Sequence, residues 1–164
     1  MKIIFLKILI VLNMFVSPSL LANKQVHEHK SKVIPDGKLI PQIRLAVFRD
    51  ASDGINLHIE TQNYRLNSPS DDRPVEMNRL QGHAHLFING VKKQRVYGAF
   101  LHLPRAWFKG GINQIAVSLN SHQHENWVAN GQNIVGSIFV DFDKAELVQH
   151  HFSSQPMTMG HQHH

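Results

Sequence analysis

The chain contains no cysteine among its 164 residues. This absence excludes disulfide bonds, thiolate metal ligands and a lipid anchor attached to a leader cysteine. It also excludes an ordinary blue-copper electron-transfer centre, which requires a cysteine thiolate. If exported, such a chain must be held together by buried apolar side chains and β-sheet pairing.

Several catalytic and binding motifs are also absent. There is no Gly-x-Ser-x-Gly motif, no phosphate-cradling glycine loop and no His-Glu-x-x-His motif. The basic residues are scattered, so we expect no nucleic-acid partner. The net charge is +5; without Lys2 and Lys7, 15 basic residues remain against 12 acidic ones. We therefore predict no enzyme, and Glu125 is the one obvious candidate for an acid–base carboxylate.

Residues 1–22 have the organisation of a secretory signal peptide. Lys2 and Lys7 precede the apolar run 8–16, and small residues suit cleavage after Ser19 or Ala22. The apolar run is short for a membrane span, and a polar segment follows it. We predict a periplasmic or secreted protein without stable membrane insertion after cleavage; an uncleaved membrane anchor is the alternative.

Short alternating apolar runs dominate the middle of the chain. Residues 41–48, 55–60 and 112–120 carry apolar side chains at every second position, which is typical of strands with one buried face. About seven such runs, without a convincing amphipathic helix, predict an all-β domain, an antiparallel two-sheet sandwich. The predicted order is a signal peptide (1–22), a flexible polar arm (23–38), the β-sandwich (39–146) and a His/Met-rich tail (147–164).

Histidine occurs 13 times, mostly in close pairs. The central pair, His83 and His85, lies on a predicted strand within residues 82–90, with Ala84 and Leu86 on the opposite face. Cα atoms two apart on a strand are separated by about 7 Å, so both rings can bind one metal ion.

That strand ends in Asn89-Gly90, a strong hairpin signal. The simplest two-residue turn would set Leu86 opposite Lys93 and so place a lysine with the core side chains. We therefore expect a longer turn or a β-bulge within residues 91–94.

Further histidines are predicted near the central pair. His102 has the same outward parity on a nearby strand, and His122 and His124 follow the end of the strand at 112–120. Three or four imidazoles can form a tetrahedral or square-planar metal site. Isolated surface histidines are the alternative interpretation. Three polar residues are candidate hydrogen-bond partners of the rings: Asn120, Glu125 and Asn126.

The tail combines imidazole and thioether ligands, namely Met157, Met159, His161, His163 and His164. Imidazole suits Cu(II), zinc and nickel, whereas thioether selects Cu(I). The histidines are interrupted by other residues, unlike a purification tag. The mixture predicts copper in either redox state, with zinc as the alternative.

These motifs resemble those of small exported bacterial proteins that are histidine-rich and immunoglobulin- or cupredoxin-like. The resemblance covers residues 41–141, and the tail separately is similar to the His/Met extensions of periplasmic copper chaperones and copper-resistance proteins. Relatives often carry Asn-Asp-His where this chain has Ser-His-Gln-His at 121–124, so His122 or His124 is the equivalent ligand. The shared pattern is GHxHLxxNG at 82–90, YG at 97–98, HLP at 102–104 and VxLN at 117–120, followed by His124.

The sequence thus predicts an exported, non-catalytic protein of copper trafficking or resistance. One ion would bind His83, His85, His102 and either His122 or His124, and the tail would collect ions or hand them to another periplasmic copper protein. Because imidazole must be deprotonated to bind, affinity should fall below about pH 6.5. Two alternatives are an immunoglobulin-like envelope interaction module with incidental histidines and a mononuclear copper oxidoreductase.

Overall fold

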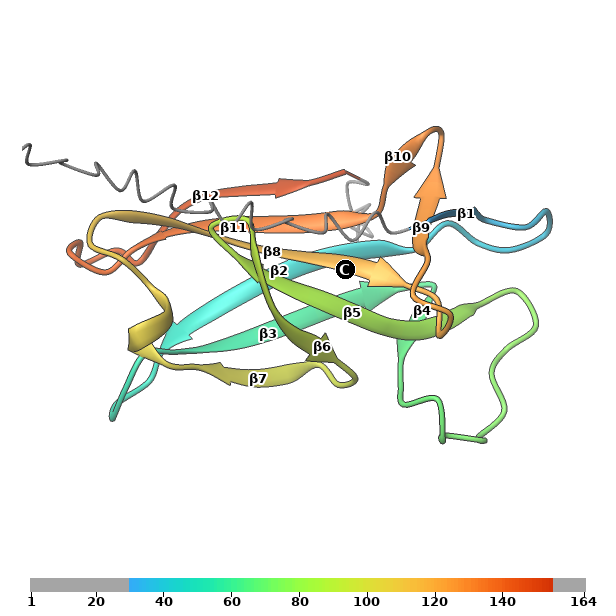
Figure 1. Ribbon diagram of the computed structural model, residues 1–164, viewed down its shortest axis with the longest axis horizontal. Helices are drawn as coiled ribbons and strands as arrows, with labels where there is room; N and C mark the ends of the chain where they lie inside the picture. The colour runs from blue at the N-terminus through green and yellow to red at the C-terminus, as the bar shows by residue number, and fades with distance from the viewer. Residues whose placement is uncertain (1–29, 155–164) are drawn as a thin grey trace, which may run out of the picture.

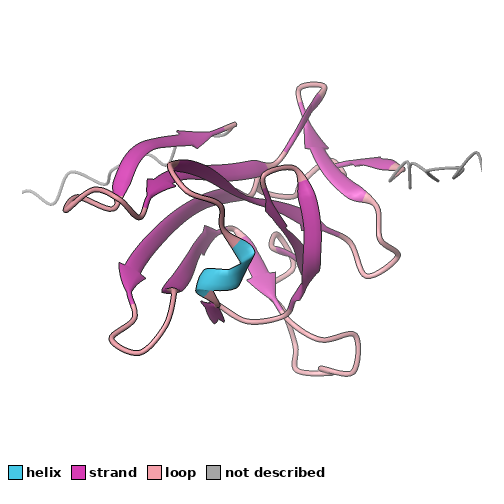
Figure 2. Ribbon diagram, turned by 60° about the vertical axis from the view of Figure 1, so that its left-hand side comes forward, coloured by secondary structure: helices cyan, strands magenta, loops and turns pink. Residues whose placement is uncertain are grey.

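Residues 30–154 are the part of the chain that the computed structural model describes, and their regular secondary structure is almost entirely β-strand (Figure 1). A short 3-10 helix, η1 (Arg105–Trp107), is cyan in Figure 2. The predicted signal peptide lies outside the described residues. The strands are β1 (Ser31–Val33), β2 (Gln42–Arg49), β3 (Ile55–Gln62), β4 (Tyr64–Leu66), β5 (Leu80–Ile88), β6 (Val91–Val96), β7 (Phe100–Leu103), β8 (Ile112–Asn120), β9 (Asn126–Ala129), β10 (Gln132–Asn133), β11 (Val135–Asp141) and β12 (Val148–Ser153).

The described strands form a large sheet of nine strands and a small sheet of three. The centre of the large sheet has the antiparallel order β12–β11–β8–β5–β6. The small sheet has the order β2–β3–β7 and is also antiparallel. Two parallel pairs, β1 with β9 and β4 with β5, extend the margins of the large sheet. The predicted all-β, two-sheet architecture is confirmed.

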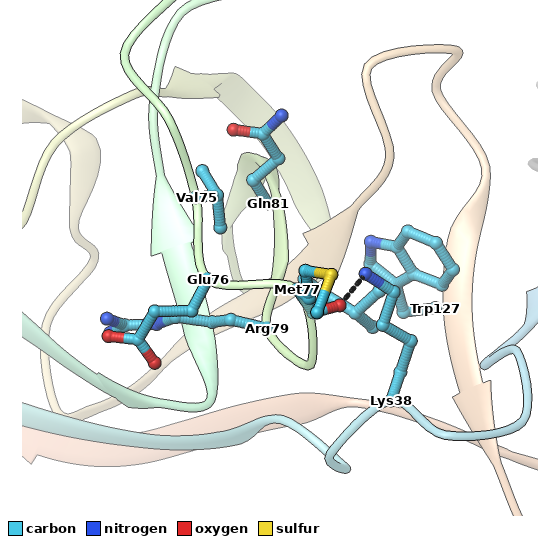
Figure 3. Close-up of a pocket in the computed structure, with 8 residues that line it drawn as sticks. Lys38, Val75, Glu76, Met77, Arg79, Gln81 and Trp127 are labelled. Carbon is cyan, nitrogen blue, oxygen red and sulfur yellow. Dashed lines mark hydrogen bonds between the residues drawn. The ribbon is translucent and has the colours of Figure 1, made fainter.

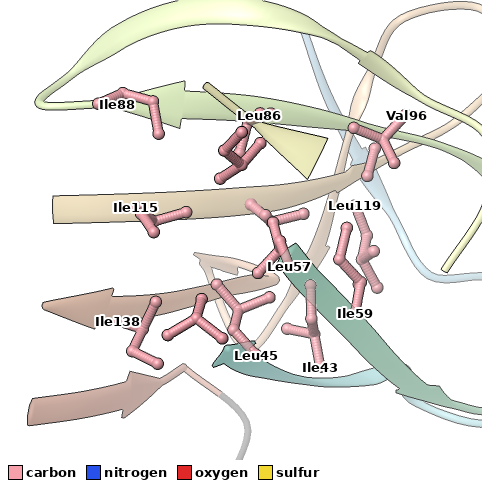
Figure 4. Packing of buried hydrophobic residues seen from close by; sticks show 14 of the residues in the cluster. Ile43, Leu45, Leu57, Ile59, Leu86, Ile88, Val96, Ile115, Leu119 and Ile138 are labelled. Carbon is pink, nitrogen blue, oxygen red and sulfur yellow. The ribbon is translucent and has the colours of Figure 1, made fainter. Parts of the chain in front are cut away.

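The two sheets share one hydrophobic core, and Figure 4 shows their apolar side chains pointing toward each other. Ile43 and Leu57 of the small sheet, and Leu86 and Ile115 of the large sheet, are each 1% exposed or less. Burying one side chain of this size stabilises the fold by about 1.5–3 kcal/mol. The alternation of apolar residues in the sequence therefore identified the buried face of each of these strands.

The β5–β6 hairpin has both a tight turn and a bulge. The turn at residues 89–90 has φ values of 50° and 79°, which Asn and Gly tolerate best. Farther along, the register shifts between Leu86 and Phe87. Leu86 consequently faces Gln94 instead of Lys93, so the bulge expected at 91–94 is confirmed.

The sandwich extends beyond the predicted residues 39–146 at both ends. Ser31–Val33, predicted to belong to the flexible arm, pairs with β9. Val148–Ser153, predicted to belong to the tail, pairs with the free edge of β11. Both strands are short and mostly exposed, so they lack the apolar period that reveals a half-buried strand.

Candidate metal centre

The candidate centre lies on the outer face of the large sheet, near the beginning of β5. Ala84 and Leu86 point into the core, so His83 and His85 project from the opposite face of the strand. Both histidines are nevertheless buried, with exposures of 1% and 0%. Other side chains must therefore cover this part of the outer face.

Two segments surround the two rings. From the β6 side, the Lys92 amine lies 3.1 Å from Nε2 of His85, and the Tyr97 ring centroid lies 5.8 Å from that of His83. From the loop after β8, the His124 ring centroid lies 4.8 Å from that of His83 and 6.0 Å from that of His85. The centre is therefore built from one strand and the segments on either side of it.

A buried tyrosine holds the backbone where β5 and β8 meet. The Tyr64 hydroxyl lies 2.7 Å from the carbonyl oxygen of Asn120 and 3.1 Å from that of His83. Burial raises the pKa of Tyr64, which keeps the hydroxyl protonated and able to donate. Gly82 has a φ of 156°, and a Cβ atom there would collide with the Tyr64 hydroxyl and the Asn120 carbonyl. Glycine therefore permits the close approach of strands beside His83.

A tight loop brings His124 over the start of β5. His124 has a φ of 67°, a left-handed conformation that costs about 1 kcal/mol or more for a residue other than glycine. Its backbone N–H donates to the Ser121 carbonyl at 2.9 Å, and the Glu125 N–H donates to the Ser121 hydroxyl at 3.3 Å. The Glu125 carboxylate also pairs with Lys32 at 2.9 Å. These contacts hold His124 in its strained position.

The three imidazoles of His83, His85 and His124 converge, with one candidate ligand atom from each lying within 4.8 Å of the others. The Nε2 atoms of His83 and His85 are 3.0 Å apart. Two nitrogen ligands on one zinc or copper ion, with bonds of about 2.0–2.1 Å, lie about 2.9–3.4 Å apart. The first pair therefore already has the spacing of two ligands on one metal ion, and the third imidazole lies within 4.8 Å of them.

Hydrogen bonds at these nitrogens indicate the tautomers. An ammonium group can only donate, so Nε2 of His85, 3.1 Å from the Lys92 amine, is an acceptor and carries no proton. This nitrogen has a single lone pair, so it accepts from either the Lys92 ammonium group or Nε2–H of His83, which lies 3.0 Å away. A metal ion bound by both Nε2 atoms would take the place of these hydrogen bonds.

The surroundings keep His83 in the neutral form that metals require. Burial, followed by the charges of His124, Arg95, His122 and Lys92, lowers the pKa of His83 to about 4. A neutral imidazole binds a metal ion without first releasing a proton to water. For this ligand, proton competition therefore becomes strong near pH 4 rather than near pH 6.5.

The structure does not bring His102 into this group. His102 lies on β7 of the small sheet, where its neighbours Leu101 and Leu103 pair with core residues of β3. Its Nε2 is 3.9 Å from the Asp53 carboxylate. Outward parity on the small sheet directs a side chain to the opposite side of the sandwich from His83.

Of the two loop histidines, the structure places His124 in the group. The ring centroid of His122 is 6.3 Å from that of His83, and its Nδ1 is buried without a hydrogen-bond partner among residues 30–154. His122 is therefore a neighbour of the triad rather than a member. The remaining predicted ligands lie outside the described residues: Met157, Met159, His161, His163 and His164.

Asn120, Asn126 and Glu125, predicted as partners of the rings, fasten the loop to its surroundings. The Asn120 amide donates to the Asn126 side chain at 2.6 Å and accepts from the Ser118 hydroxyl at 2.8 Å. Glu125 accepts from the Ser121 hydroxyl at 3.0 Å. Their effect on the triad is to position the segment that carries His124.

Four contributors to the centre were not predicted from the sequence: Gly82, Tyr64, Lys92 and Arg95. The ambiguous register of residues 91–94 was the one signal that pointed toward Lys92, because a bulge changes which face a side chain occupies. Tyr64 precedes an irregular segment, and nothing in its surroundings indicated burial beside β5.

A separate hollow of about 330 Å³ lies on the surface between residues 75–81 and β9 (Figure 3). Lys38 crosses it and donates to the backbone carbonyl of Met77, and the Trp127 ring forms one wall (Figure 3). None of the triad histidines lines this hollow, so the two features are independent.

No protein-family model, curated protein or solved structure matches this chain. The resemblance to exported histidine-rich proteins therefore stays a prediction. Within residues 30–154, no helix has the length and apolar character needed to cross a membrane.

Proposed function

We propose that this protein binds a copper ion at the triad of His83, His85 and His124. The observation that supports a metal site is the convergence of three imidazoles, two of them buried, within 4.8 Å. A buried pair with its Nε2 atoms 3.0 Å apart serves no packing purpose that apolar side chains would not serve better.

Copper is the metal that best suits the ligand chemistry. Imidazole binds Cu(II), zinc and nickel, and the order of intrinsic affinities places Cu(II) above the other two. The thioethers of Met157 and Met159 add a preference for Cu(I) in the tail. Zinc, which also accepts three imidazoles, is the alternative metal.

Copper trafficking or resistance outside the cytoplasm is the role that we propose for this binding. It is supported by the signal-peptide pattern of residues 1–22 and by the similarity of the tail to those of periplasmic copper proteins. The partner would be another copper protein of the same compartment, receiving ions from the tail or from the triad.

Metal titrations of the full mature chain test the proposal. We expect Cu(II) under air and Cu(I) under anaerobic conditions to bind with more than one ion per chain, because the triad and the tail both contribute ligands. His85→Ala should remove one of these ions and leave the tail ions in place. His102→Ala is the matched control, since that histidine lies on the outer face of the other sheet.

Unchanged affinity and stoichiometry in the double variant His83→Ala, His85→Ala would refute the triad as a metal site. A preference for zinc over copper in competition with chromophoric chelators would retain the site and replace the metal. Metal analysis of the untagged protein from its native host would then identify the ion that it carries in the cell.

A second candidate function, an interaction module of the cell envelope, is favoured by the outer face of the small sheet. Phe48 and Phe100 are 61% and 76% exposed there. Aromatic side chains on an open sheet face are common anchors in protein interfaces. Copper-independent capture of a stable envelope partner, lost in Phe100→Ala, would support this function.

A further inference from the structure

The triad offers a metal ion neutral ligands alone. Within the described residues, the group consists entirely of histidines. Glu125, the nearest carboxylate along the chain, is bonded to Ser121 and paired with Lys32. A divalent ion held by three imidazoles keeps its full charge and, in a four-coordinate site, one open position.

Two cationic side chains lie on the same face of the sheet as these histidines. The Lys92 amine lies 3.1 Å from Nε2 of His85, one of the atoms that would hold the ion. Arg95 pairs directly with His85 across β5 and β6, which puts both side chains on one face with Cβ atoms about 4.5–5.5 Å apart. Both charges act on His83, and burial together with Arg95 lowers the pKa of Lys92.

The bulge in the hairpin is what aims Lys92 at the histidines. Lys92 pairs with Phe87, which shares the outward face of His85, whereas the inserted Lys93 has its amine 5.6 Å from the Trp107 ring centroid. Bulges of this kind are found beside functional sites, where they redirect one side chain. The bulge therefore places the side chains of Lys92 and Lys93 in different surroundings.

A dication beside an ammonium and a guanidinium group is destabilised by electrostatic repulsion. An anion bound to the metal ion in the open coordination position would instead be attracted by both the ammonium and the guanidinium group. Lysine offers a compact charge with three donors, and arginine offers a planar fork that matches the two oxygens of a carboxylate.

We propose that the metal ion of the triad takes a small oxyanion of the carboxylate or bicarbonate class as a further ligand, and that Lys92 and Arg95 hold this anion. The inference rests on the proposed metal site and adds a second ligand to it. Binding of metal and anion is then cooperative, since each compensates the charge of the other.

The test uses the full chain loaded with Co(II), whose visible spectrum reports changes in coordination. Acetate and, separately, bicarbonate are titrated at constant ionic strength set with sodium perchlorate. We expect a saturable spectral change in the wild type. Lys92→Ala should weaken acetate binding about tenfold, the loss expected for one charge-assisted hydrogen bond. Lys93→Ala is the matched control and should behave as the wild type.

Metal affinity without acetate gives an independent measurement of opposite sign. Removing the Lys92 charge should leave Co(II) affinity equal to or higher than that of the wild type. Weaker Co(II) binding by Lys92→Ala would show that the amine is itself a metal ligand, and would overturn the inference. Circular dichroism checks that each variant is folded.

The failure of this inference is distinguishable from failure of the metal site. If His85→Ala loses Co(II) binding while the visible spectrum of the Co(II)-loaded wild type is unchanged by acetate and bicarbonate, the metal site is supported and the anion role is refuted. If the folded wild type binds neither Co(II) nor Cu(II) nor zinc at the triad, both proposals fail together.

Discussion

Two outward-facing histidine pairs lie on opposite sides of this sandwich, and their surroundings differ. His83 and His85 on the large sheet are 1% and 0% exposed. On the small sheet, the His58 and His102 side chains are 30% and 44% exposed. The His58 ring stacks on Phe100 with centroids 4.2 Å apart, so its contacts are those of an ordinary surface residue.

The difference teaches that strand alternation alone does not make a site. Both pairs occupy outward positions on their strands. Within the described residues, however, further segments of the chain cover only the pair on the large sheet, from β6 and from the loop after β8. That cover removes water, lowers the pKa of His83 to about 4 and adds the third imidazole. Cover by other segments of the chain is therefore what distinguishes the candidate metal centre from separate histidines on a sheet surface.

The largest effect is expected from a substitution that disrupts the backbone contact beside His83 and His85. Gly82→Ala places a methyl group against the Tyr64 hydroxyl and the Asn120 carbonyl, at a φ that other residues rarely adopt. We expect a loss of about 3 kcal/mol or more in the free energy of unfolding, measured by urea denaturation. Gly98→Ala is the control, because nothing lies near the added carbon. Equal midpoints for the two variants would contradict the proposed close approach.

A second prediction sharpens which loop histidine completes the covered pair. His124→Ala should lower copper affinity at the triad by about 100-fold, and His122→Ala by less than about threefold. The reason is that a ring nitrogen of His124 lies within 4.8 Å of candidate ligand nitrogens of both strand histidines, whereas His122 is outside this group, with its ring centroid 6.3 Å from that of His83. The reverse order in competition titrations would assign His122 as the ligand.

A third prediction compares the two pairs through pH. The pKa of His83 is about 4 in the folded protein and about 6.5 in the unfolded chain, so the unfolded state takes up the proton first as pH falls. Stability of the metal-free protein should therefore decrease by about 2 kcal/mol between pH 7 and pH 5 through His83 alone. Urea denaturation of His83→Gln in EDTA should lack this part of the pH dependence. Parallel curves for variant and wild type would contradict the buried neutral state.

The smallest effect is expected on the outer face of the small sheet, which carries His58 and His102. Phe100→Ala removes the stacking with His58 and should cost about 0.5–1.5 kcal/mol in the free energy of unfolding. Metal affinity should be unchanged, because Phe100 belongs to the other face of the molecule. A loss of metal binding in this variant would mean that the two faces are coupled through the core.

Much of the fold could be predicted from the sequence because the buried strands alternate strictly. Ile43, Leu45 and Val47 show this pattern, and all three are core residues. The short marginal strands β1 and β12 could not be predicted, since their pairing depends on a neighbouring strand edge rather than on their own side chains.

The candidate site was predictable only in part. His83 and His85 are two apart on one strand, so local geometry alone brings their rings together. The position of His124 depends on the register between β5 and β8. In this register His83 faces Asn120, so the loop that follows Asn120 lies beside the two rings. Lys92 requires the bulge, whose position depends on the packing of the whole hairpin.

The sequence by itself determined which strand positions face outward and that a tight Asn-Gly turn follows β5. Only the tertiary structure decided that His124 joins the pair and that His102 does not. Alternation sets the parity of a residue within its strand, whereas membership of a sheet and the docking of a loop depend on contacts between distant residues. Histidines of identical parity therefore form a buried cluster on one face and lie partly exposed on the other.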